Sequence, residues 1–548
     1  MCFSPPAWAQ LLHYLSDARR HIGPSLVAIP PFDDRLHAFR EPLQVDERRS
    51  FPVAGAKEQQ LSDGKAMPPP RPDASSCFPF ARDTARFNLF MALNTSDAQL
   101  LKDIYQRLTD KPLQPENSFY EQIYSRLDGE DPVAKLRTHI EWASTESLQL
   151  FSGFRGTGKT TELYRLKREL EAKGFLVLYA DALEYLSPSE EVDITTMLLS
   201  VAGAFGEQVA KLPGGRSIGE TFWQRIGTYL TKTSIEVSEV AVKVEGGTPA
   251  KELLGDLKAG LDLKLALKTA PSFRQKLQSF LANRLYELKA QVNAFVEESV
   301  KRVRQDKPDL QIVFLFDQFE QLRGSRSNEQ DVIHSVEQLF ANHLERLRLP
   351  YVHVIYTVPP WLQFVLPAAF SIETLPCVRL WNNDAKRTRY EPGWKLLREA
   401  IVKRFEPAGF ARIFGEGRSG QAVADRLIGM SGGHFRDLLR LFRETIVLIQ
   451  TWRPTLPVAP EVLERAIVNV RNEYLPIAIE DAHWLDKIAA SRGLALPDSS
   501  PQSVGRVSRF LDTHLVLYLT NGDDWYDIHP LVRDTVSELA KPPASANA

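Results

Sequence analysis

A glycine-rich stretch between residues 153 and 161 holds the residue types that bind a phosphate chain. Gly153 is followed, after four residues, by Gly158, Lys159 and Thr160, which is the spacing of a phosphate-binding loop. Glycines let the backbone turn its N–H groups toward phosphate oxygens, and the N-terminus of a following helix adds positive charge there. We expect Lys159 to reach the β and γ phosphates of a nucleotide and Thr160 to ligate Mg²⁺. The expected nucleotide-binding set is Gly153, Phe154, Arg155, Gly156, Thr157, Gly158, Lys159, Thr160 and Thr161.

A second group of candidate residues follows an apolar run, Ile312 to Phe316. Such a run is typical of a strand buried on both faces, and ligands bind at the carboxyl ends of parallel strands. Asp317 stands at that end and is expected to hold Mg²⁺ together with Thr160. Hydrolysis also needs a group that takes a proton from water, and Glu320 is the best candidate for this catalytic base. Gln318 could orient water but could not accept a proton at neutral pH.

A third candidate, Arg436, follows a glycine pair in the sequence SGGHFRD at 431–437. At the start of a helix after a glycine turn, it could swing over the bound nucleotide as a catalytic residue, or it could form a surface or lid-internal salt bridge. Two further polar residues also leave alternatives open. Asp181 could touch magnesium through water or cap the next turn. Thr357 could contact the γ-phosphate or the attacking water, or its hydroxyl could be satisfied by nearby backbone.

The elements that must position these residues alternate between strands and helices. Such alternation predicts an α/β fold with a parallel, doubly wound sheet covered by helices on both faces. The apolar pattern predicts a long helix over Ser272 to Asp306 and two possibilities, a hairpin or amphipathic helices, within 212–272. The strands are expected near Leu148–Phe151, Phe175–Ala180, Ile312–Phe316, Tyr351–Thr357 and Cys377–Leu380.

Composition shifts divide the chain into six parts. Residues 1–86 form a Pro-rich, largely disordered extension, which is either a tether for a partner or of no consequence. Residues 87–143 form a helical segment expected to pack on the ATPase core, with helices at Asp97–Leu108, Phe119–Leu127 and Asp131–Trp142. The other expected parts are a P-loop core at 144–390 with an insertion at about 212–272, a helical lid at 391–455, a winged-helix-like domain at 456–540 and a disordered tail at 541–548.

The winged helix is indicated by helices followed by two alternating runs around Asn521-Gly522, a hairpin signal. Such a module often reads DNA through the helix before the wing. That helix offers only Arg506 and Arg509. We favour protein packing over DNA because two acidic residues, at 523 and 524, lie on the wing, where they oppose phosphate contact.

Overall composition is that of a soluble globular protein. The chain has 548 residues and a net charge of −2, so no global basic field indicates nucleic acid. Its three cysteines are far apart and form no metal-binding or disulfide spacing, which suits a reducing cytoplasm. No apolar run of membrane-spanning length occurs, so we expect a cytoplasmic protein without a membrane partner.

Three motifs resemble those of one group of bacterial ATPases, the additional-strand P-loop group, and especially its origin-recognition-like AAA+ and STAND members. The motifs are FSGFRGTGKT, VFLFDQFEQL and GGHFRDLLRL. The resemblance implies ATP and Mg²⁺ as ligands and makes Arg436 the sensor-2 residue of the lid. The chain departs from the family in having Asp317-Gln318 in place of an Asp-Glu pair. It also has no arginine between Thr357 and Cys377, so catalysis in trans within a ring is not implied.

The expected function is an ATP-binding regulatory switch that hydrolyses ATP slowly and couples its nucleotide state to an unidentified protein partner. One alternative is an ATP-gated DNA-binding protein of the initiator or loader type, acting through the winged helix. Another is a scaffold that retains nucleotide without hydrolysing it, which the glutamine at 318 would fit.

Overall fold

The structure is a computed structural model that describes residues 93–127, 131–213, 221–241, 263–325, 327–367, 370–496, 498 and 500–541. All of these belong to one compact unit, Ala81–Ala548. The predicted extension at 1–86 lies outside the described residues, as do 214–220 and 242–262 of the predicted insertion and nearly all of the tail.

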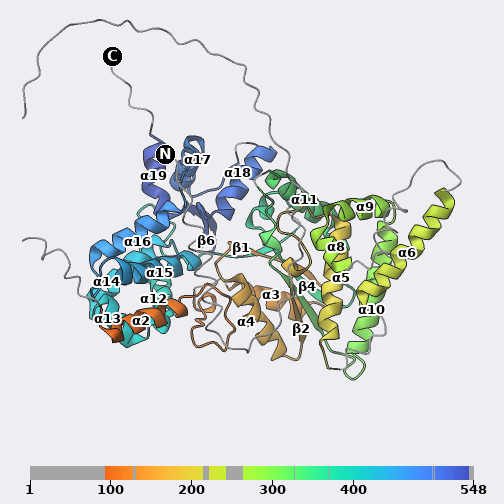
Figure 1. The fold of residues 1–548 in the computed structure, drawn as a ribbon, viewed down its shortest axis with the longest axis horizontal. Coiled ribbons are helices and arrows are strands. Elements are labelled where there is room, and N and C mark those ends of the chain that lie inside the picture. The colour runs from red at the N-terminus through yellow and green to blue at the C-terminus, as the bar shows by residue number, and fades with distance from the viewer. Residues whose placement is uncertain are drawn as a thin grey trace, which may run out of the picture. The chain divides into compact units, whose positions relative to one another are not determined.

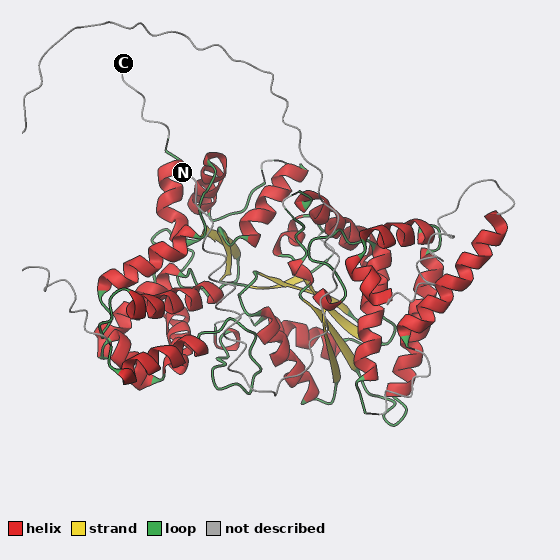
Figure 2. Ribbon diagram, in the orientation of Figure 1, coloured by secondary structure: helices red, strands yellow, loops and turns green. Residues whose placement is uncertain are grey.

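A five-stranded parallel sheet forms the centre of the unit and confirms the predicted fold class (Figure 2). The strand order is β2-β3-β4-β1-β5. β4 therefore lies between β1, which leads into the glycine-rich loop, and β3, which ends in Asp317. All carboxyl ends meet at one edge of the sheet. The strands are β1 (Leu148–Gly153), β2 (Leu176–Asp181), β3 (Ile312–Asp317), β4 (Val352–Val358) and β5 (Ile372–Leu375).

Both faces of the sheet are buried, as the apolar run in β3 predicts. Phe314 and Phe316 pack in one core with α5 (Ile194–Ala210) and α10 (Leu285–Val303). Val313 and Leu315 point to the other face and pack in a second core. The helices of that second face are α3 (Pro132–Trp142) and α4 (Lys159–Glu171), which lie across the sheet from α5 in Figure 1.

The predicted last strand at Cys377–Leu380 is wrong, because β5 ends at Leu375. The amide of Cys377 donates to Tyr518 O of the winged helix, and the amide of Val378 donates to Gly433 O of the lid. This apolar run is buried because three parts of the molecule converge on it, and it forms no ladder with the sheet.

Most described residues of the insertion are helical and none forms a strand, which decides between the two predicted alternatives for those residues. The single long helix predicted over Ser272–Asp306 is wrong: it breaks at 282–284, and the two resulting helices both contact α5. The break lets each half turn its apolar side toward the same neighbour. The helices of this region are α6 (Phe222–Ala241), α8 (Leu263–Thr269), α9 (Pro271–Leu281) and α10, followed after β3 by α11 (Glu329–His343).

The N-terminal segment, expected to pack on the core, divides between two neighbours. α3 contacts α4 and β5, whereas α2 (Thr95–Arg107) contacts lid helices α12 and α15 and lies among the lid helices in Figure 1. Asp97 of α2 pairs with Arg412 of the lid at 2.6 Å. The predicted helix at Phe119–Leu127 is wrong, because only Tyr124–Arg126 is helical and its surroundings bond to other elements.

The lid contains one helix that the periodicity did not predict, α13 (Pro407–Phe414), which is short and begins at a proline. Its Phe410 and Phe414 pack on Phe405 of the preceding helix. The other lid helices are α12 (Glu391–Phe405), α14 (Gly417–Met430) and α15 (Phe435–Thr451).

The C-terminal part has the helices and the hairpin of a winged helix, and the strands pair antiparallel around Asn521-Gly522 as predicted. None of the helices in the described ranges is long and apolar enough to span a bilayer. The elements are α16 (Pro460–Asn472), α17 (Ile479–Ser491), α18 (Pro501–Asp512), β6 (Val516–Thr520), β7 (Asp524–Ile528) and α19 (Arg533–Leu539). The short 3-10 helices of the unit are η1 (Tyr124–Arg126), η2 (Ala182–Glu184), η4 (Phe319–Gln321), η5 (Leu344–Leu347), η6 (Pro360–Phe364) and η7 (Pro530–Val532).

Candidate nucleotide-binding site

The glycine-rich loop connects the end of β1 to the first residue of α4. Gly156 and Gly158 have φ angles of 100° and 104°, a region that residues with a Cβ rarely adopt. The first hydrogen bond of α4 runs from the Glu162 amide to Gly158 O. The amides of the preceding residues therefore stand at the N-terminus of a helix, where an anion is stabilised.

Lys159 lies folded back over the loop and is almost completely buried, with 4% of its surface exposed. Its ammonium donates to Gly153 O at 2.9 Å and to Phe154 O at 3.1 Å. The third partner of the ammonium is the Glu320 carboxylate, at 2.9 Å. In this conformation the lysine expected to bind phosphate is therefore neutralised by the residue expected to be the base.

Thr160 in the first turn of α4 lies beside Asp317, the last residue of β3. The Thr160 hydroxyl donates to the Asp317 carboxylate at 2.7 Å, and the Tyr179 hydroxyl and the Gln318 amide donate to the same group. Burial and the nearby Glu320 charge raise the pKa of Asp317 to about 6. A carboxylate and a hydroxyl at this spacing are hard oxygen donors, which fit Mg²⁺ with water and phosphate as its remaining ligands.

Glu320 is held beside this pair by an unusual backbone turn. Gln318 has φ 68°, in the left-handed region, and the chain then makes the single 3-10 turn η4. One oxygen of Glu320 pairs with Lys159, whereas Oε2 is buried without a hydrogen-bond partner. An unsatisfied buried carboxylate oxygen next to Asp317 is a ready acceptor for a water proton. The structure thus places Glu320 where the predicted role requires it, and the role itself stays a prediction.

Asp181 and Thr357, whose roles the sequence left open, both form local hydrogen bonds. Asp181 accepts the Leu183 amide at 2.8 Å, which is the capping alternative, and also receives the Gln318 side chain. Thr357 is fully buried, and its hydroxyl oxygen accepts the Phe319 amide at 3.2 Å. Thr357 therefore holds the turn that carries Glu320.

A cavity of about 240 Å³ lies over the loop, between the N-terminal segment and the lid. The predicted residues Lys159, Thr160 and Glu320 lie in its wall together with Arg436. Its apolar part comes from the N-terminal segment, from the run after β5 and from α15. Those apolar lining residues are Leu113, Phe119, Ile123, Val378, Phe435 and Leu439.

Arg436 reaches the loop from the first turn of α15. Its amide donates to Gly156 O at 3.1 Å, and a Cβ added at Gly156 would meet the Arg436 Cβ at 2.6 Å. The guanidinium lies 3.2 Å from Asp110 of the N-terminal segment. The predicted lid arginine is therefore at the phosphate loop, and in this conformation it is paired across the cavity mouth.

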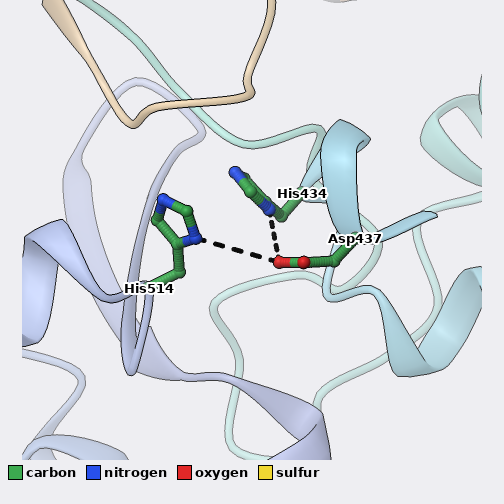
Figure 3. Close-up of side chains that lie close together, drawn as sticks. All are labelled: His434, Asp437 and His514. Carbon is green, nitrogen blue, oxygen red and sulfur yellow. Dashed lines mark hydrogen bonds and ion pairs between the residues drawn. The ribbon is translucent and has the colours of Figure 1, made fainter. Parts of the chain in front are cut away.

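Sequence reasoning missed a buried cluster in which the lid, the loop and the winged helix meet (Figure 3). His434 lies 2.5 Å from the Asp437 carboxylate through Nδ1 and 3.0 Å from Arg155 O of the loop through Nε2. The ring thus bridges a carboxylate of its own helix and a backbone carbonyl of the loop. His514 of the winged helix completes the group, with Nδ1 3.9 Å from Asp437.

Further side chains converge on Asp437 from both sides. Arg440 donates to one carboxylate oxygen at 2.8 Å, and the Tyr474 hydroxyl donates to the other at 2.7 Å. Burial alone would raise the pKa of Asp437, but the His434 charge and the hydrogen bonds from His434 and His529 hold it well below its usual value. Burial lowers the pKa of both His514 and His529.

Ligand atoms of His434, Asp437 and His514 lie within 4.8 Å of one another, close enough for a metal ion. The hydrogen bonds argue for protons instead. Both oxygens of Asp437 already accept hydrogen bonds, one from Arg440 and the other from Tyr474, and Nδ1 of His434 lies 2.5 Å from the same carboxylate, too close for an ion to lie between them. The only sequence signal for this junction was the glycine pair: a Cβ at Gly433 would lie 1.8 Å from Val378 O.

The winged helix is docked against the α/β core. α18 contacts α11 and η6. Asp512 at the end of α18 lies 3.5 Å from Arg323, which follows η4. The two arginines offered for DNA are paired with acids of α17, Arg506 with Glu480 at 3.1 Å and Arg509 with Asp481 at 2.8 Å.

No protein-family model and no curated protein matches the chain. Several solved structures do match. The ADP form of Aeropyrum pernix ORC2 is 11% identical over 80% of this chain and 98% of that chain, with a TM-score of 0.36. CDC6P from Pyrobaculum aerophilum is 9% identical over 80% and 97%, with a TM-score of 0.29. Drosophila ORC bound to AT-rich DNA and Cdc6 is 9% identical over 80% and 55%, with a TM-score of 0.27. Similarities at this level assign neither a ligand nor an activity to this chain.

Proposed function

We propose that the protein is an ATP-binding switch of the AAA+ type that hydrolyses ATP and thereby controls the docking of its winged helix. The observation that carries the proposal is the convergence of Lys159, Thr160, Asp317 and Glu320 around one helix N-terminus, beside a cavity. These residues come from two strands that are not neighbours in the sheet. Their meeting supports the motif assignment, because a chance glycine turn would not bring a buried lysine and two carboxylates together.

Each of these side chains has a role that its contacts support. The loop amides and the Lys159 ammonium bind the phosphate oxygens, and Lys159 exchanges Glu320 for the γ-phosphate as it does so. Thr160 and Asp317 would hold Mg²⁺, which would supply positive charge to neutralise the phosphates. Glu320, released from Lys159, accepts a proton from the attacking water. The water oxygen bonds to the γ-phosphorus, the bond to the bridging oxygen breaks, and ADP and phosphate leave.

The contacts of the lid support the switch part of the proposal. Arg436 and His434 both bond to loop backbone, at Gly156 O and Arg155 O. The same His434 pairs with Asp437, which also receives side chains of the winged-helix region. A phosphate chain that moves the loop, or draws Arg436 away from Asp110, would therefore change the surface on which the winged helix is docked.

The test compares the rate of ATP hydrolysis in three proteins: the wild type, Lys159→Ala and the surface control Lys173→Ala. Lys173 pairs with Glu141 on the surface after α4 and touches no residue of the cavity. We expect Mg²⁺-dependent phosphate release in the wild type and the control, and a loss of at least about 100-fold in Lys159→Ala, from one charge-assisted phosphate contact. Equal turnover in all three proteins would end the assignment. Retained nucleotide without phosphate release would support the non-hydrolysing scaffold.

The second candidate function is ATP-gated DNA binding. The winged helix is the observation that favours it, since this module commonly places such a helix in the major groove. With α18 docked and its arginines paired to α17, binding would need release of the domain. Salt-dependent binding of duplex DNA that appears only with ATP and weakens in the double variant Arg506→Ala/Arg509→Ala would establish it. Unchanged DNA affinity in the double variant would leave a protein as the partner of the switch.

A further inference from the structure

Arg404, near the end of α12, is a buried cation without a counter-ion. Only 2% of its surface is exposed. Nη1 donates to Ala400 O of its own helix at 2.8 Å, whereas Nε is buried and has no hydrogen-bond partner. Burial alone lowers the pKa of Arg404 to about 10. Within the described ranges, no carboxylate pairs with its guanidinium.

An unpaired buried charge is costly, so proteins normally supply a partner. This chain does so elsewhere. Arg165 is equally buried, with 1% exposed, and it contacts Glu162 at 2.7 Å and Asp131 at 2.5 Å. The contrast between the two arginines indicates that the missing partner of Arg404 belongs to a ligand.

The place of Arg404 shows which part of a ligand it would meet. It lies in the wall of the cavity over the loop, with its guanidinium 5.2 Å from the centre of the Phe435 ring. This wall comes from lid helices α12 and α15. The phosphate-binding groups come from β1, α4 and β3 instead. Apolar side chains of Ile123, Val378 and Leu439 line the same cavity.

We infer that Arg404 recognises the purine base of the bound nucleotide, which lies against Phe435 and Leu439 and accepts a hydrogen bond from the Arg404 guanidinium on a ring nitrogen. A guanidinium can only donate, and purine ring nitrogens are acceptors in the plane of the base. The flat apolar surroundings suit the faces of the base, and cation–π contact adds to them. This inference rests on the proposed function, and it gives the cavity a specificity-determining residue outside the three motifs.

The experiment compares two ligands on the same proteins. Isothermal titration with Mg-ATP reports the base and the phosphates together, whereas Mg-tripolyphosphate reports the phosphates alone. We expect Arg404→Met to weaken ATP binding by at least about 10-fold, the effect of losing one charged hydrogen bond. Tripolyphosphate binding should stay within twofold. The control Lys395→Met removes a cation of the same helix that is 68% exposed and pairs with Glu399 outside the cavity wall, and it should change neither affinity.

The stability of the ligand-free protein gives a second readout. Because Arg404→Met removes an unpaired buried charge, its melting temperature without ligand should be equal to or above that of the wild type. A purely structural role for Arg404 predicts a lower one. Three results would each overturn the inference: an equal loss of affinity for both ligands in Arg404→Met, an unchanged affinity for ATP, or failure of this variant to fold. If the wild type binds neither ligand, the proposed function fails as well, and the two failures are thereby distinguished.

Discussion

Glu320→Gln tests the most consequential contact of the site, the ion pair between Lys159 and Glu320. The two charged groups lie 2.9 Å apart, and each side chain is less than 10% exposed. Removing one partner of a buried pair typically costs about 3–5 kcal/mol of folding free energy. Glutamine keeps an acceptor for Lys159, so we expect a smaller loss of about 1.5–3 kcal/mol, the range for a hydrogen bond to a charged group.

The loss should depend on nucleotide. At 100 times its dissociation constant, Mg-ATP stabilises a protein by about 2.7 kcal/mol. In the proposed mechanism the γ-phosphate replaces Glu320 on Lys159. At equal ATP concentrations the variant should therefore be stabilised more than the wild type, and it should bind ATP more tightly. The difference in unfolding free energy between the two proteins should at least halve. Phosphate release by the variant should fall, because an amide cannot take the water proton.

The assay is denaturant unfolding followed by tryptophan fluorescence, with and without Mg-ATP. Glu345→Gln is the matched control: Glu345 pairs with Arg348, but its side chain is 67% exposed. Such an exposed pair is worth about 0–1 kcal/mol, and nucleotide should not alter the control. An unchanged difference between Glu320→Gln and the wild type upon ATP addition would refute the exchange of partners on Lys159. Normal turnover by the variant would exclude Glu320 as the base.

Two further outcomes follow from the loop and from the buried junction. Gly156→Ala should lower the free energy of unfolding by about 1–3 kcal/mol and reduce ATP turnover. The φ of 100° is strained for alanine, and the Arg436 side chain leaves no space for the added methyl group. Turnover and stability equal to those of the wild type would contradict this. His514→Gln should lose less stability in acid than the wild type. The pKa of His514 is well below its usual value in the folded protein, so only the unfolded chain takes up this proton below about pH 6.5, at about 1.4 kcal/mol per pH unit. The measurement is the free energy of unfolding of both proteins from pH 7.5 to 5, and parallel curves would rule the effect out. His434, Asp437 and Arg323 face this ring in both proteins, so the difference between the curves reports His514.

The chemistry of the loop could be predicted from the sequence because it depends on residues that are close in the chain. Gly153, Lys159 and Thr160 sit within one strand–turn–helix unit, whose backbone geometry follows from the glycines and the apolar pattern around them. The position of Asp317 at a strand end could be predicted too. A continuous apolar run that ends in a carboxylate can be recognised in the sequence without knowing which strands lie beside it. The structure then brought Thr160 and Asp317 within 2.7 Å.

The contacts between these units could not be predicted, since they join residues that lie far apart in the chain. Periodicity gave one helix at Ser272–Asp306, where packing of both halves on α5 requires a break. The apolar run at Cys377–Leu380 was assigned to a strand because burial by the sheet and burial by a converging lid and winged helix give the same pattern. The local sequence gives Arg165 acids at helical spacing, Glu162 and Glu169, and gives Arg404 none, but it could not predict that both arginines are buried.

The sequence alone determined that a phosphate-binding loop, a strand-end carboxylate and a wing-bearing C-terminal module occur in this chain, because each is encoded by short-range spacing and backbone preference. Only the tertiary structure decided how they are joined. It paired Lys159 with Glu320, set Arg436 against Gly156, and gathered three histidines on Asp437 where the lid meets the winged helix. Burial and charge act through space, and which groups share a low-dielectric interior is fixed only when the whole unit has packed.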